Sequence, residues 1–329
     1  MDWSGAKVLV TGAGGFIGSH LTERLVNEGA SVRAFVRYNS KGTRGFVDDF
    51  TPQVGERLEI TAGDLRDPHA VSKAVGGMDY VFHLGALIAI PYSYVHPREV
   101  VETNVMGTLN VLNACLEAKP KRVVHTSTSE VYGTAQYVPI DEKHPLCGQS
   151  PYSASKIGAD QLAESYHRAF DLPVATLRPF NTYGPRQSAR AVIPTVITQA
   201  IARDTVQVGA MHPVRDLTFV ADTVEGFIRI ADCDAALGRV VNLGWGQGSS
   251  VKEIVEKIIA KVGRKVEVMF DATRVRPAKS EVERLVADST WAREEMGWEP
   301  KVDLDEGLER TIKWISEHFR MYSPEEYAI

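Results

Sequence analysis

Two residues four positions apart, Tyr152 and Lys156 in the segment PYSASK, could carry out acid–base chemistry. The segment predicts the start of a helix, and positions i and i+4 lie on one face of a helix, so the two side chains are within reach of each other. An ammonium group beside a phenol stabilises the phenolate and lowers the pKa of the phenol. The pair could therefore take a proton from a hydroxyl group while a hydride leaves the same carbon. By itself, a tyrosine four residues before a lysine is common, and such a pair more often has a structural role.

A carboxylate follows a strand-like apolar run in the segment TSTSEVYG, where the chain presents Thr128, Ser129 and Glu130 in succession. Glu130 could cap a helix or lie in a solvated loop, because most surface glutamates have no chemical role. If the apolar run is a parallel strand, however, its carboxyl end is where open α/β sheets bind ligands. In that place Glu130 could act as an acid or a base.

The segment TGAGGFIGSH places Gly12, Gly15 and Gly18 between a predicted strand and a predicted helix. Glycines in this context allow a tight turn and a close approach of the backbone to a pyrophosphate, which the amides at the helix N-terminus then face. The context makes the motif much more specific than the glycine spacing alone. It predicts a dinucleotide site.

The end of the second predicted strand, AFVRYNSKGTR, carries Arg37 where an acidic residue would read a free 2′-hydroxyl of the adenosine ribose. Lys41 and Arg44 follow, so the charge favours a 2′-phosphate and therefore NADP. A solvated basic loop that stacks on adenine is the alternative. Asp64, after the third predicted strand, is expected to meet the adenine edge or to cap the helix that begins near Pro68.

The elements that must position these residues follow from alternating strand and helix patterns. The predicted strands are KVLVT at 7–11, SVRAFVR at 31–37, RLEITAG at 57–63, DYVFHLGA at 79–86, KRVVHTS at 121–127 and PVATLR at 173–178. The predicted helices cover 16–29, 67–77, 98–118 and 152–170, followed later by 192–204, 220–232 and 250–263. Strands that alternate with helices in this way predict a parallel sheet covered on both faces.

We therefore expect an α/β fold in which residues 1–178 form a dinucleotide-binding Rossmann domain with a doubly wound parallel sheet. Residues 179–329 are expected to form mainly a smaller α/β substrate-binding lobe, with chain crossing back to the first domain. The cleft between the two parts is the expected ligand site.

The bulk composition narrows the function classes. A chain of 329 residues with 44% hydrophobic residues can bury a large core, and a formal net charge of -5 gives no field that attracts nucleic acid or an anionic membrane. Cys115, Cys147 and Cys233 are too few and too scattered for a disulfide framework, which favours the cytoplasm. The histidines show no metal-ligand spacing, so we expect no metal. We also expect neither a signal peptide nor a membrane span.

The glycine loop, Asp64, STSEVYG, the Tyr152 and Lys156 pair, and RPFNTYGPRQ together resemble an extended short-chain dehydrogenase/reductase of the nucleotide-sugar epimerase and dehydratase type. The similarity covers nearly the whole chain, through VRDLTFVADTVEGF and RPAKSEVERLVAD. It implies that Tyr152 is the base, that Lys156 holds the phenolate and the nicotinamide ribose, and that Thr128 binds a sugar oxygen. It also implies a tightly bound, recycled NAD or NADP. The expected cofactor-binding residues are Gly12, Gly15, Phe16, Ile17, Gly18, Arg37, Asp64, Leu65, Leu84, Tyr152 and Lys156.

Within this resemblance, Glu130 favours a 4,6-dehydratase, which must remove the C5 proton and expel the 6-hydroxyl as water after C4 is oxidised. Many such dehydratases have an Asp-Glu pair where this chain has Ser129 and Glu130, so Glu130 is expected to carry out both proton transfers. The Thr-Ser-Glu pattern resembles the GDP-mannose dehydratase branch and also UDP-glucuronate decarboxylases. A 4-epimerase or a decarboxylase therefore remains an alternative, as does a non-catalytic NAD(P)-sensing protein.

The substrate is expected to be a UDP- or GDP-linked hexose, N-acetylated or not. Arginines offer planar donors to a diphosphate, and the expected substrate-binding residues are Asn181, Arg186, Arg190, Arg215 and Arg276. The resemblance also implies a homodimer formed through the helices predicted within 98–118 and 152–170.

Overall fold

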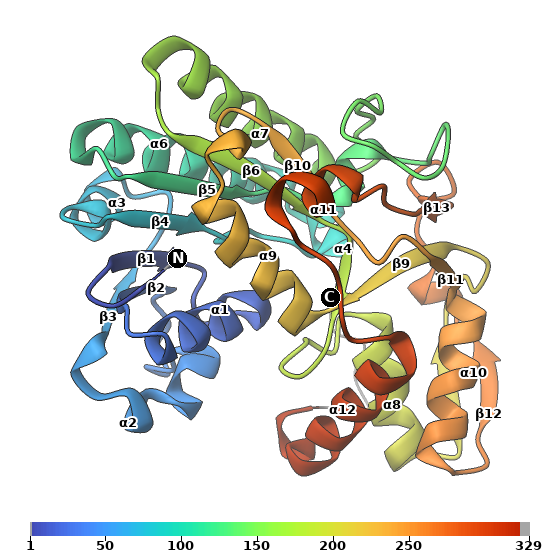
Figure 1. Cartoon of the computed structure of the whole chain (residues 1–329). Helices are drawn as coiled ribbons and strands as arrows, with labels where there is room; N and C mark the ends of the chain where they lie inside the picture. Colours follow the sequence, from blue (N-terminus) through green and yellow to red (C-terminus); the bar gives the residue numbers. More distant parts are fainter. Residues whose placement is uncertain (1, 323–329) are drawn as a thin grey trace.

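A parallel sheet of seven strands forms the centre of the molecule (Figure 1). The computed structural model describes residues 2–322, and the strand order is β3-β2-β1-β4-β5-β6-β10. Neighbouring strands are parallel throughout. The strands are β1 (Lys7–Thr11), β2 (Ser31–Arg37), β3 (Leu58–Gly63), β4 (Tyr80–His83), β5 (Arg122–Thr126), β6 (Val174–Pro179) and β10 (Val240–Leu243). The order reverses between β1 and β4, which is where doubly wound sheets bind ligands.

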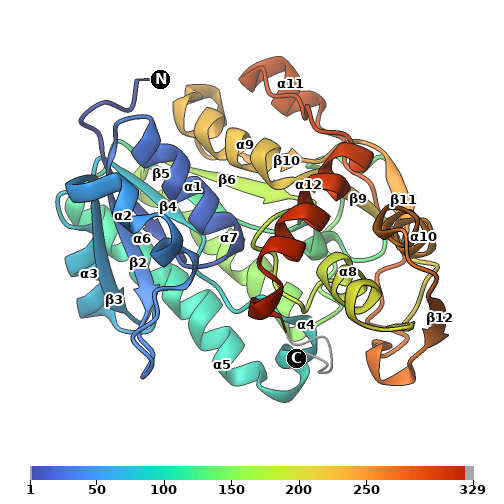
Figure 2. The same cartoon turned by 90° about the horizontal axis from the view of Figure 1, so that it is seen from below.

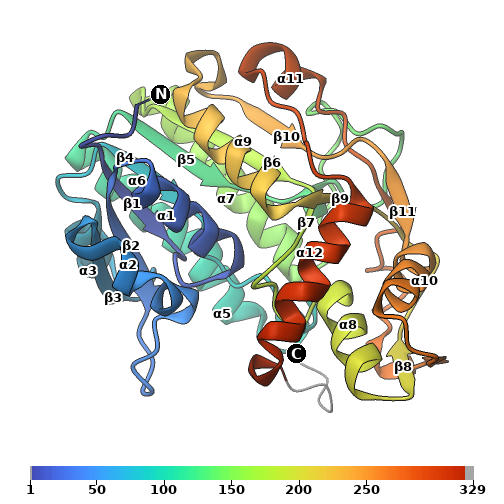
Figure 3. The ribbon, with the colours of Figure 1, turned by 60° about the horizontal axis from the view of Figure 1, so that its bottom comes forward.

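Both faces of the sheet are buried, because successive side chains of a strand point to opposite faces. Val8 and Val10 of β1 belong to one hydrophobic core together with Leu21, whereas Leu9 belongs to a second core together with Leu112. The first face is covered by α1 (Phe16–Asn27) and α9 (Val220–Asp232), and the second by α3 (Pro68–Val75), α6 (Gly107–Ala118) and α7 (Pro151–Phe170) (Figures 2 and 3). The predicted α/β, doubly wound fold class is confirmed.

The helix predicted over 98–118 is interrupted. It consists of α5 (Pro97–Val101), a π-helical turn η3 (Glu102–Met106) and α6. Within the turn, the Asn104 amide donates to Leu87 O at 2.9 Å and to Ser155 Oγ at 3.0 Å, and Leu87 N donates to Asn104 Oδ1 at 2.8 Å. The π turn thus ties the loop after β4 to α7, a tertiary contact that apolar periodicity does not encode.

The chain after β6 forms a second lobe, shown at the lower right of Figure 1. Its helices are α8 (Val192–Ala202), α10 (Val251–Val262) and α12 (Leu304–Glu317). Its strands are β7 (Asn181–Tyr183), β8 (Thr205–Val208), β9 (Val214–Phe219), β11 (Gly248–Ser250), β12 (Glu267–Phe270) and β13 (Arg284–Leu285). Between these segments, α9 and β10 return to the main sheet, so the chain crosses between the two parts.

Three short helices complete the architecture: α2 (Thr51–Val54), α4 (Ile90–Val95) and α11 (Thr290–Met296). Among the helices of residues 2–322, none combines the length and the apolar character that crossing a membrane requires.

Candidate active site

A cavity of about 710 Å³ lies where the carboxyl ends of the main-sheet strands meet the second lobe. The sequence-predicted residues that line it are Gly12, Gly15, Phe16, Ile17, Gly18, Arg37, Leu84, Thr128, Ser129, Glu130, Tyr152, Asn181, Arg190 and Arg276. The other predicted residues, Asp64, Leu65, Lys156, Arg186 and Arg215, are not among its lining residues. The glycine loop, the segment after β5 and the start of α7 therefore meet in one pocket.

The glycine loop has a shape that only glycine can adopt at two positions. Gly12 has φ +70°, and a Cβ atom built on it would come within 2.9 Å of the Gly85 backbone. A Cβ atom on Gly18 would lie 2.2 Å from Gly12 O. The loop leads directly into α1, which begins at Phe16 and points its free amides toward the pocket. This cradle fits a dinucleotide pyrophosphate.

At the end of β2, the Arg37 guanidinium has a carboxylate partner. Arg37 Nη2 donates to Glu99 Oε1 at 3.2 Å, and the Arg37 side chain is 59% exposed. Asp64 accepts two bonds from the Arg66 guanidinium, at 2.6 and 3.0 Å, and one from Arg66 N at 2.9 Å. The helix α3 is instead capped by Asp67, so the alternative that Asp64 caps it is wrong.

Leu65 is buried behind the pocket, and its carbonyl accepts a hydrogen bond from the Asn110 side chain at 2.8 Å. Its side chain packs so tightly on Gly85 that a Cβ atom there would lie 2.8 Å from Leu65 Cδ1. Leu65 thus supports the loop that lines the cavity, and direct contact with a cofactor stays a prediction.

Tyr152 lies in the first turn of α7, whose start is fixed by local sequence. Ser150 and Ser153 form a reciprocal capping box, with Pro151 at the first helical position. Burial raises the pKa of the Tyr152 phenol well above its usual range, and the carboxylates of Glu130 and Asp160 add to this, whereas a hydrogen bond with Thr128 opposes it. The expected lowering of this pKa is therefore absent, because burial is the largest effect.

Lys156 lies one turn further along α7, and its Nζ donates to Thr126 O of β5 at 2.6 Å. Burial lowers the pKa of Lys156 to about 8, although the Asp160 carboxylate opposes this shift. The bond to Thr126 fixes the ammonium group at the carboxyl end of β5, directly behind the segment that carries Thr128 and Glu130.

A buried polar network lies beneath this pair. Asp160 accepts hydrogen bonds from His125 Nε2 at 3.1 Å, from Ser127 Oγ at 2.6 Å and from Arg178 Nη2 at 2.8 Å. Burial by itself would raise the pKa of Asp160, but the His125 hydrogen bond and the Arg178 charge bring it below its usual range. The carboxylate is therefore ionised, and it joins β5, β6 and α7 one helical turn after Lys156.

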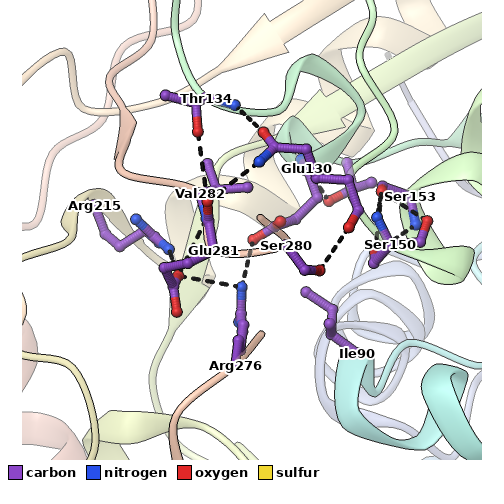
Figure 4. A network of polar contacts seen from close by, with 12 residues as sticks. Ile90, Glu130, Thr134, Ser150, Ser153, Arg215, Arg276, Ser280, Glu281 and Val282 are labelled. Carbon is purple, nitrogen blue, oxygen red and sulfur yellow. Dashed lines mark hydrogen bonds and ion pairs between the residues drawn. The ribbon is translucent and has the colours of Figure 1, made fainter. Parts of the chain in front are cut away.

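Glu130 lies at the wall of the cavity in a chain of charged side chains (Figure 4). It belongs to the short turn η4 (Ser129–Tyr132), in which Glu130 N donates to Thr128 Oγ1 at 3.3 Å. Arg276 Nη1 is 3.8 Å from Glu130 Oε1 and 3.6 Å from Glu281 Oε1. Arg215 Nη2 donates to the same Glu281 oxygen at 3.1 Å. Glu281 thus holds two arginines side by side next to Glu130.

Four polar atoms of residues that line the cavity have no hydrogen-bond partner in the described part of the chain. They are Arg276 Nη1, a donor, Thr126 Oγ1, a hydroxyl, and the acceptors Asn181 Oδ1 and Gln187 Oε1, and all four are buried. Buried polar groups are normally paired, so unpaired ones that face a cavity are expected to meet a ligand. The Arg276 donor suits an anionic group of a ligand, and the amide acceptors suit its hydroxyl or N–H groups.

Arg186 is turned away from this cavity. Its Nη2 donates to Glu23 Oε2 of α1 at 2.7 Å, and its guanidinium lies over the Phe50 ring. These contacts join the second lobe to α1. A direct contact with substrate stays a prediction for Asn181, Arg190, Arg215 and Arg276, and the geometry gives no support to Arg186.

Sequence reasoning missed two carboxylates next to the site, Glu99 and Glu281. Each lies on a segment that is distant in sequence, and each forms an ion pair with an arginine for which the sequence indicated no partner. No local sequence signal marks them, because only the fold brings them to their partners. Within residues 2–322, no cluster of three or more His, Cys, Asp or Glu residues could hold a metal ion.

Comparisons with known proteins agree with this geometry. The family model described as GDP-mannose 4,6 dehydratase matches residues 9–311. A dTDP-glucose 4,6-dehydratase of Streptomyces griseus is 34% identical over 323 residues, covering 96% of each chain. A UDP-glucose 4-epimerase of Mycolicibacterium smegmatis is 32% identical over 315 residues, covering 94% of this chain and 98% of that protein.

A solved structure of the dTDP-glucose 4,6-dehydratase DesIV from Streptomyces venezuelae, with NAD bound, superposes with a TM-score of 0.88. It is 29% identical in sequence, and the match covers 97% of this chain and 100% of the other.

Proposed function

This chain belongs to the GDP-mannose 4,6-dehydratase family of extended short-chain dehydrogenases/reductases, and we therefore propose that it is a nucleotide-sugar 4,6-dehydratase. The family consists of NAD-dependent enzymes that act on nucleotide sugars, and its members include dehydratases and epimerases. The observation that carries the choice of a dehydratase is Glu130, a carboxylate in the cavity wall together with Tyr152 and Thr128.

Each residue of the site has its own step in the proposed reaction. When bound, the dinucleotide would take a hydride from C4 of the sugar and return it to C6. Tyr152, as a phenolate that Lys156 stabilises, takes the proton of the 4-hydroxyl and becomes a phenol, and Thr128 binds the sugar oxygen. The C4 ketone acidifies the C5 proton, which Glu130 removes. The same proton leaves with the 6-hydroxyl as water, and C5 is reprotonated from solvent.

Glu130 has to make both transfers because the neighbouring residue is Ser129, whose hydroxyl is a poor proton donor. Among the described residues that line the cavity, Glu130 is the only carboxylate. Its position after β5, in the cavity wall, gives it access to the ligand, and Arg276 Nη1 lies 3.8 Å from its Oε1.

A second candidate, a decarboxylase that acts on a nucleotide-linked glucuronate, is favoured by Arg276. The Nη1 of this guanidinium has no hydrogen bond and lies 3.8 Å from Glu130 Oε1 and 3.6 Å from Glu281 Oε1, in the part of the cavity where the proposed reaction places C5 and C6. A sugar carboxylate at C6 would be a suitable ion-pair partner for it. Both candidates begin with C4 oxidation, so they share Tyr152 and Lys156.

The cofactor is an NAD-type dinucleotide, in line with the family and with the NAD-bound neighbour. The glycine cradle would hold its pyrophosphate, and Tyr152 and Lys156 would meet its nicotinamide end. Arg37 at the end of β2 lines the cavity at the position that distinguishes a 2′-hydroxyl from a 2′-phosphate, so its surroundings bear on the choice between NAD and NADP.

The test of the proposed function is incubation of the purified protein with a panel of nucleotide sugars in deuterated water, followed by mass spectrometry. The panel is UDP-N-acetylglucosamine, UDP-glucose, UDP-glucuronate, GDP-mannose and dTDP-glucose. Loss of one water with deuterium at C5 is expected for one of them. Loss of carbon dioxide from UDP-glucuronate would favour the decarboxylase, and a changed C4 configuration without mass loss would favour a 4-epimerase. Binding of cofactor without turnover of any sugar would contradict an enzymatic role with these substrates.

Asp160→Asn is expected to lower the stability of the fold and to change the pKa of Lys156, which supports Tyr152 as the base. The substitution leaves the buried Arg178 without its counter-ion, which costs about 3 kcal/mol of the free energy of unfolding. Because the Asp160 charge raises the pKa of Lys156, its loss lowers that pKa further. Lys156 then loses its proton at a lower pH, so the alkaline limb of the pH–rate profile moves to lower pH. Urea denaturation and pH–rate measurements test this.

The control for this variant is Asp171→Asn, at the exposed C-cap of α7, where asparagine tolerates the left-handed backbone. This control should change neither measurement. An Asp160→Asn protein with the wild-type urea midpoint and pH profile would show that the network beneath Lys156 has no such role.

We further propose a homodimer formed through α6 and α7, with a cytoplasmic location. Exposed apolar side chains lie in the turn before α6 and at the end of α7: Met106 is 47% exposed and Phe170 is 57% exposed. Light scattering should give twice the chain mass of 36.2 kDa. Met106→Glu should shift the protein toward monomers, because it places a charge in the apolar face. A wild-type mass of one chain would contradict the dimer.

A further inference from the structure

The acid missing from the end of β2 is supplied by another part of the chain. In dinucleotide-binding folds an acidic residue at this position favours a free 2′-hydroxyl, and here the position holds Arg37. Glu99, on α5, accepts from Arg37 Nη2 at 3.2 Å. A carboxylate therefore lies beside the position that distinguishes the two cofactors, although the local sequence there is basic.

Glu99 is held in place by more than Arg37. The Tyr92 hydroxyl of α4 donates to Glu99 Oε2, and Arg66 Nη1 lies 3.8 Å from Glu99 Oε1. The hydrogen bond from Tyr92, together with the Arg37 charge, lowers the pKa of Glu99, so the side chain is ionised. Its orientation is fixed from two sides, by α4 and by the segment after β3.

Three arginines near this end of the cavity have carboxylate partners. Arg66 is held by Asp64, whose oxygen is 2.6 Å from Nη2, and Arg37 is held by Glu99. Arg44, which follows Lys41 in the loop after β2, forms an ion pair with Asp48. A 2′-phosphate would have to separate Arg37 from Glu99 or accept a second anion next to it, whereas a 2′-hydroxyl carries no charge.

We propose that Glu99 sets the cofactor preference, by neutralising Arg37 and by repelling a 2′-phosphate, so that the basic end of β2 still favours NAD over NADP. The inference rests on the dinucleotide site of the proposed function but not on the reaction that follows. The preference for NAD differs from the prediction based on Arg37 alone, which favoured NADP.

The Glu99–Arg37 pair is exposed enough that its loss should leave the fold intact. The side chains are 26% and 59% exposed, and ion pairs at such positions contribute between 0 and about 1 kcal/mol to stability. A change in cofactor preference on substitution of Glu99 can therefore be separated from unfolding.

The test is the ratio of bound NADP to bound NAD. The purified wild-type, Glu99→Gln, Glu102→Gln and Arg37→Ala proteins are equilibrated with equal concentrations of both nucleotides and desalted. The nucleotide is released with acid and quantified by mass spectrometry. Glu99→Gln is expected to raise the ratio roughly tenfold, because a like charge near the phosphate is removed and Arg37 becomes available. Arg37→Ala is expected to lower it.

Glu102→Gln is the matched control, because Glu102 follows α5 directly and forms an exposed ion pair with Arg98. Its ratio should equal that of the wild type. A Glu99→Gln ratio within twofold of the wild type, or an equal rise in both Gln variants, would overturn the role of Glu99. Wild-type protein that retains neither nucleotide would instead overturn the dinucleotide site and the proposed function with it.

Discussion

Tyr152→Phe is expected to lower kcat about a thousandfold, with little change in nucleotide-sugar binding. The Tyr152 phenolate is the group that takes the 4-hydroxyl proton, and a phenyl ring keeps the shape of the side chain while removing that proton acceptor. Tyr152 is only 7% exposed, so water has little room to replace it. Turnover is measured as loss of substrate mass, and binding is measured by calorimetry.

Tyr166→Phe, on the same helix, is the control for this substitution. The Tyr166 hydroxyl bonds to Asn113 of α6, away from the cavity, so turnover should remain at the wild-type level. A Tyr152→Phe protein with more than a tenth of wild-type turnover would show that another group is the base.

Glu130→Gln is expected to separate the two halves of the reaction. C4 oxidation should persist, because Tyr152 and Lys156 are untouched, whereas water elimination should fall at least a hundredfold, because an amide cannot remove the C5 proton. Single-turnover absorbance of the reduced dinucleotide follows the first half, and mass spectrometry of the sugar nucleotide follows the second. The reduced dinucleotide and the 4-keto sugar should therefore accumulate.

Glu283→Gln provides the control, since Glu283 lies two residues beyond Glu281 and pairs with His212 at the surface. It should leave both halves unchanged. Full elimination by Glu130→Gln would remove Glu130 from the proposed role. Unchanged turnover without any loss of water would instead agree with an epimerase, in which this carboxylate has no proton to transfer.

The strand predictions succeeded where apolar runs are continuous and flanked by turn residues. β1 and β2 have the predicted bounds, and α9 has the predicted bounds of 220–232. β10, with four residues, was not predicted, because so short a run carries little pattern of its own. The interruption at Asn104 was missed because it depends on contacts with Leu87 and Ser155, which are distant in sequence.

The sequence predicted which residues form the candidate site, but it did not predict which of their charges are neutralised by ion pairs. The glycine loop, Tyr152 and Glu130 meet in one cavity, as their motifs indicate. The arginines were expected to meet phosphate groups, yet Arg37, Arg186, Arg215 and Arg276 each have a carboxylate partner. Partners brought together by the fold leave no trace in local spacing, so the sequence overstated the positive charge that a ligand would meet.

The position of β10 has a consequence for how the protein is made. This strand pairs with β6, yet the sixty residues 180–239 separate the two in the chain. During synthesis, β6 remains an uncovered sheet edge until the later segment emerges, and long-range parallel pairing of this kind is slow. A fragment that ends at Arg178 would keep that edge permanently open and prone to aggregate. A chimera that exchanges the second lobe must therefore retain residues 220–243 with the first domain.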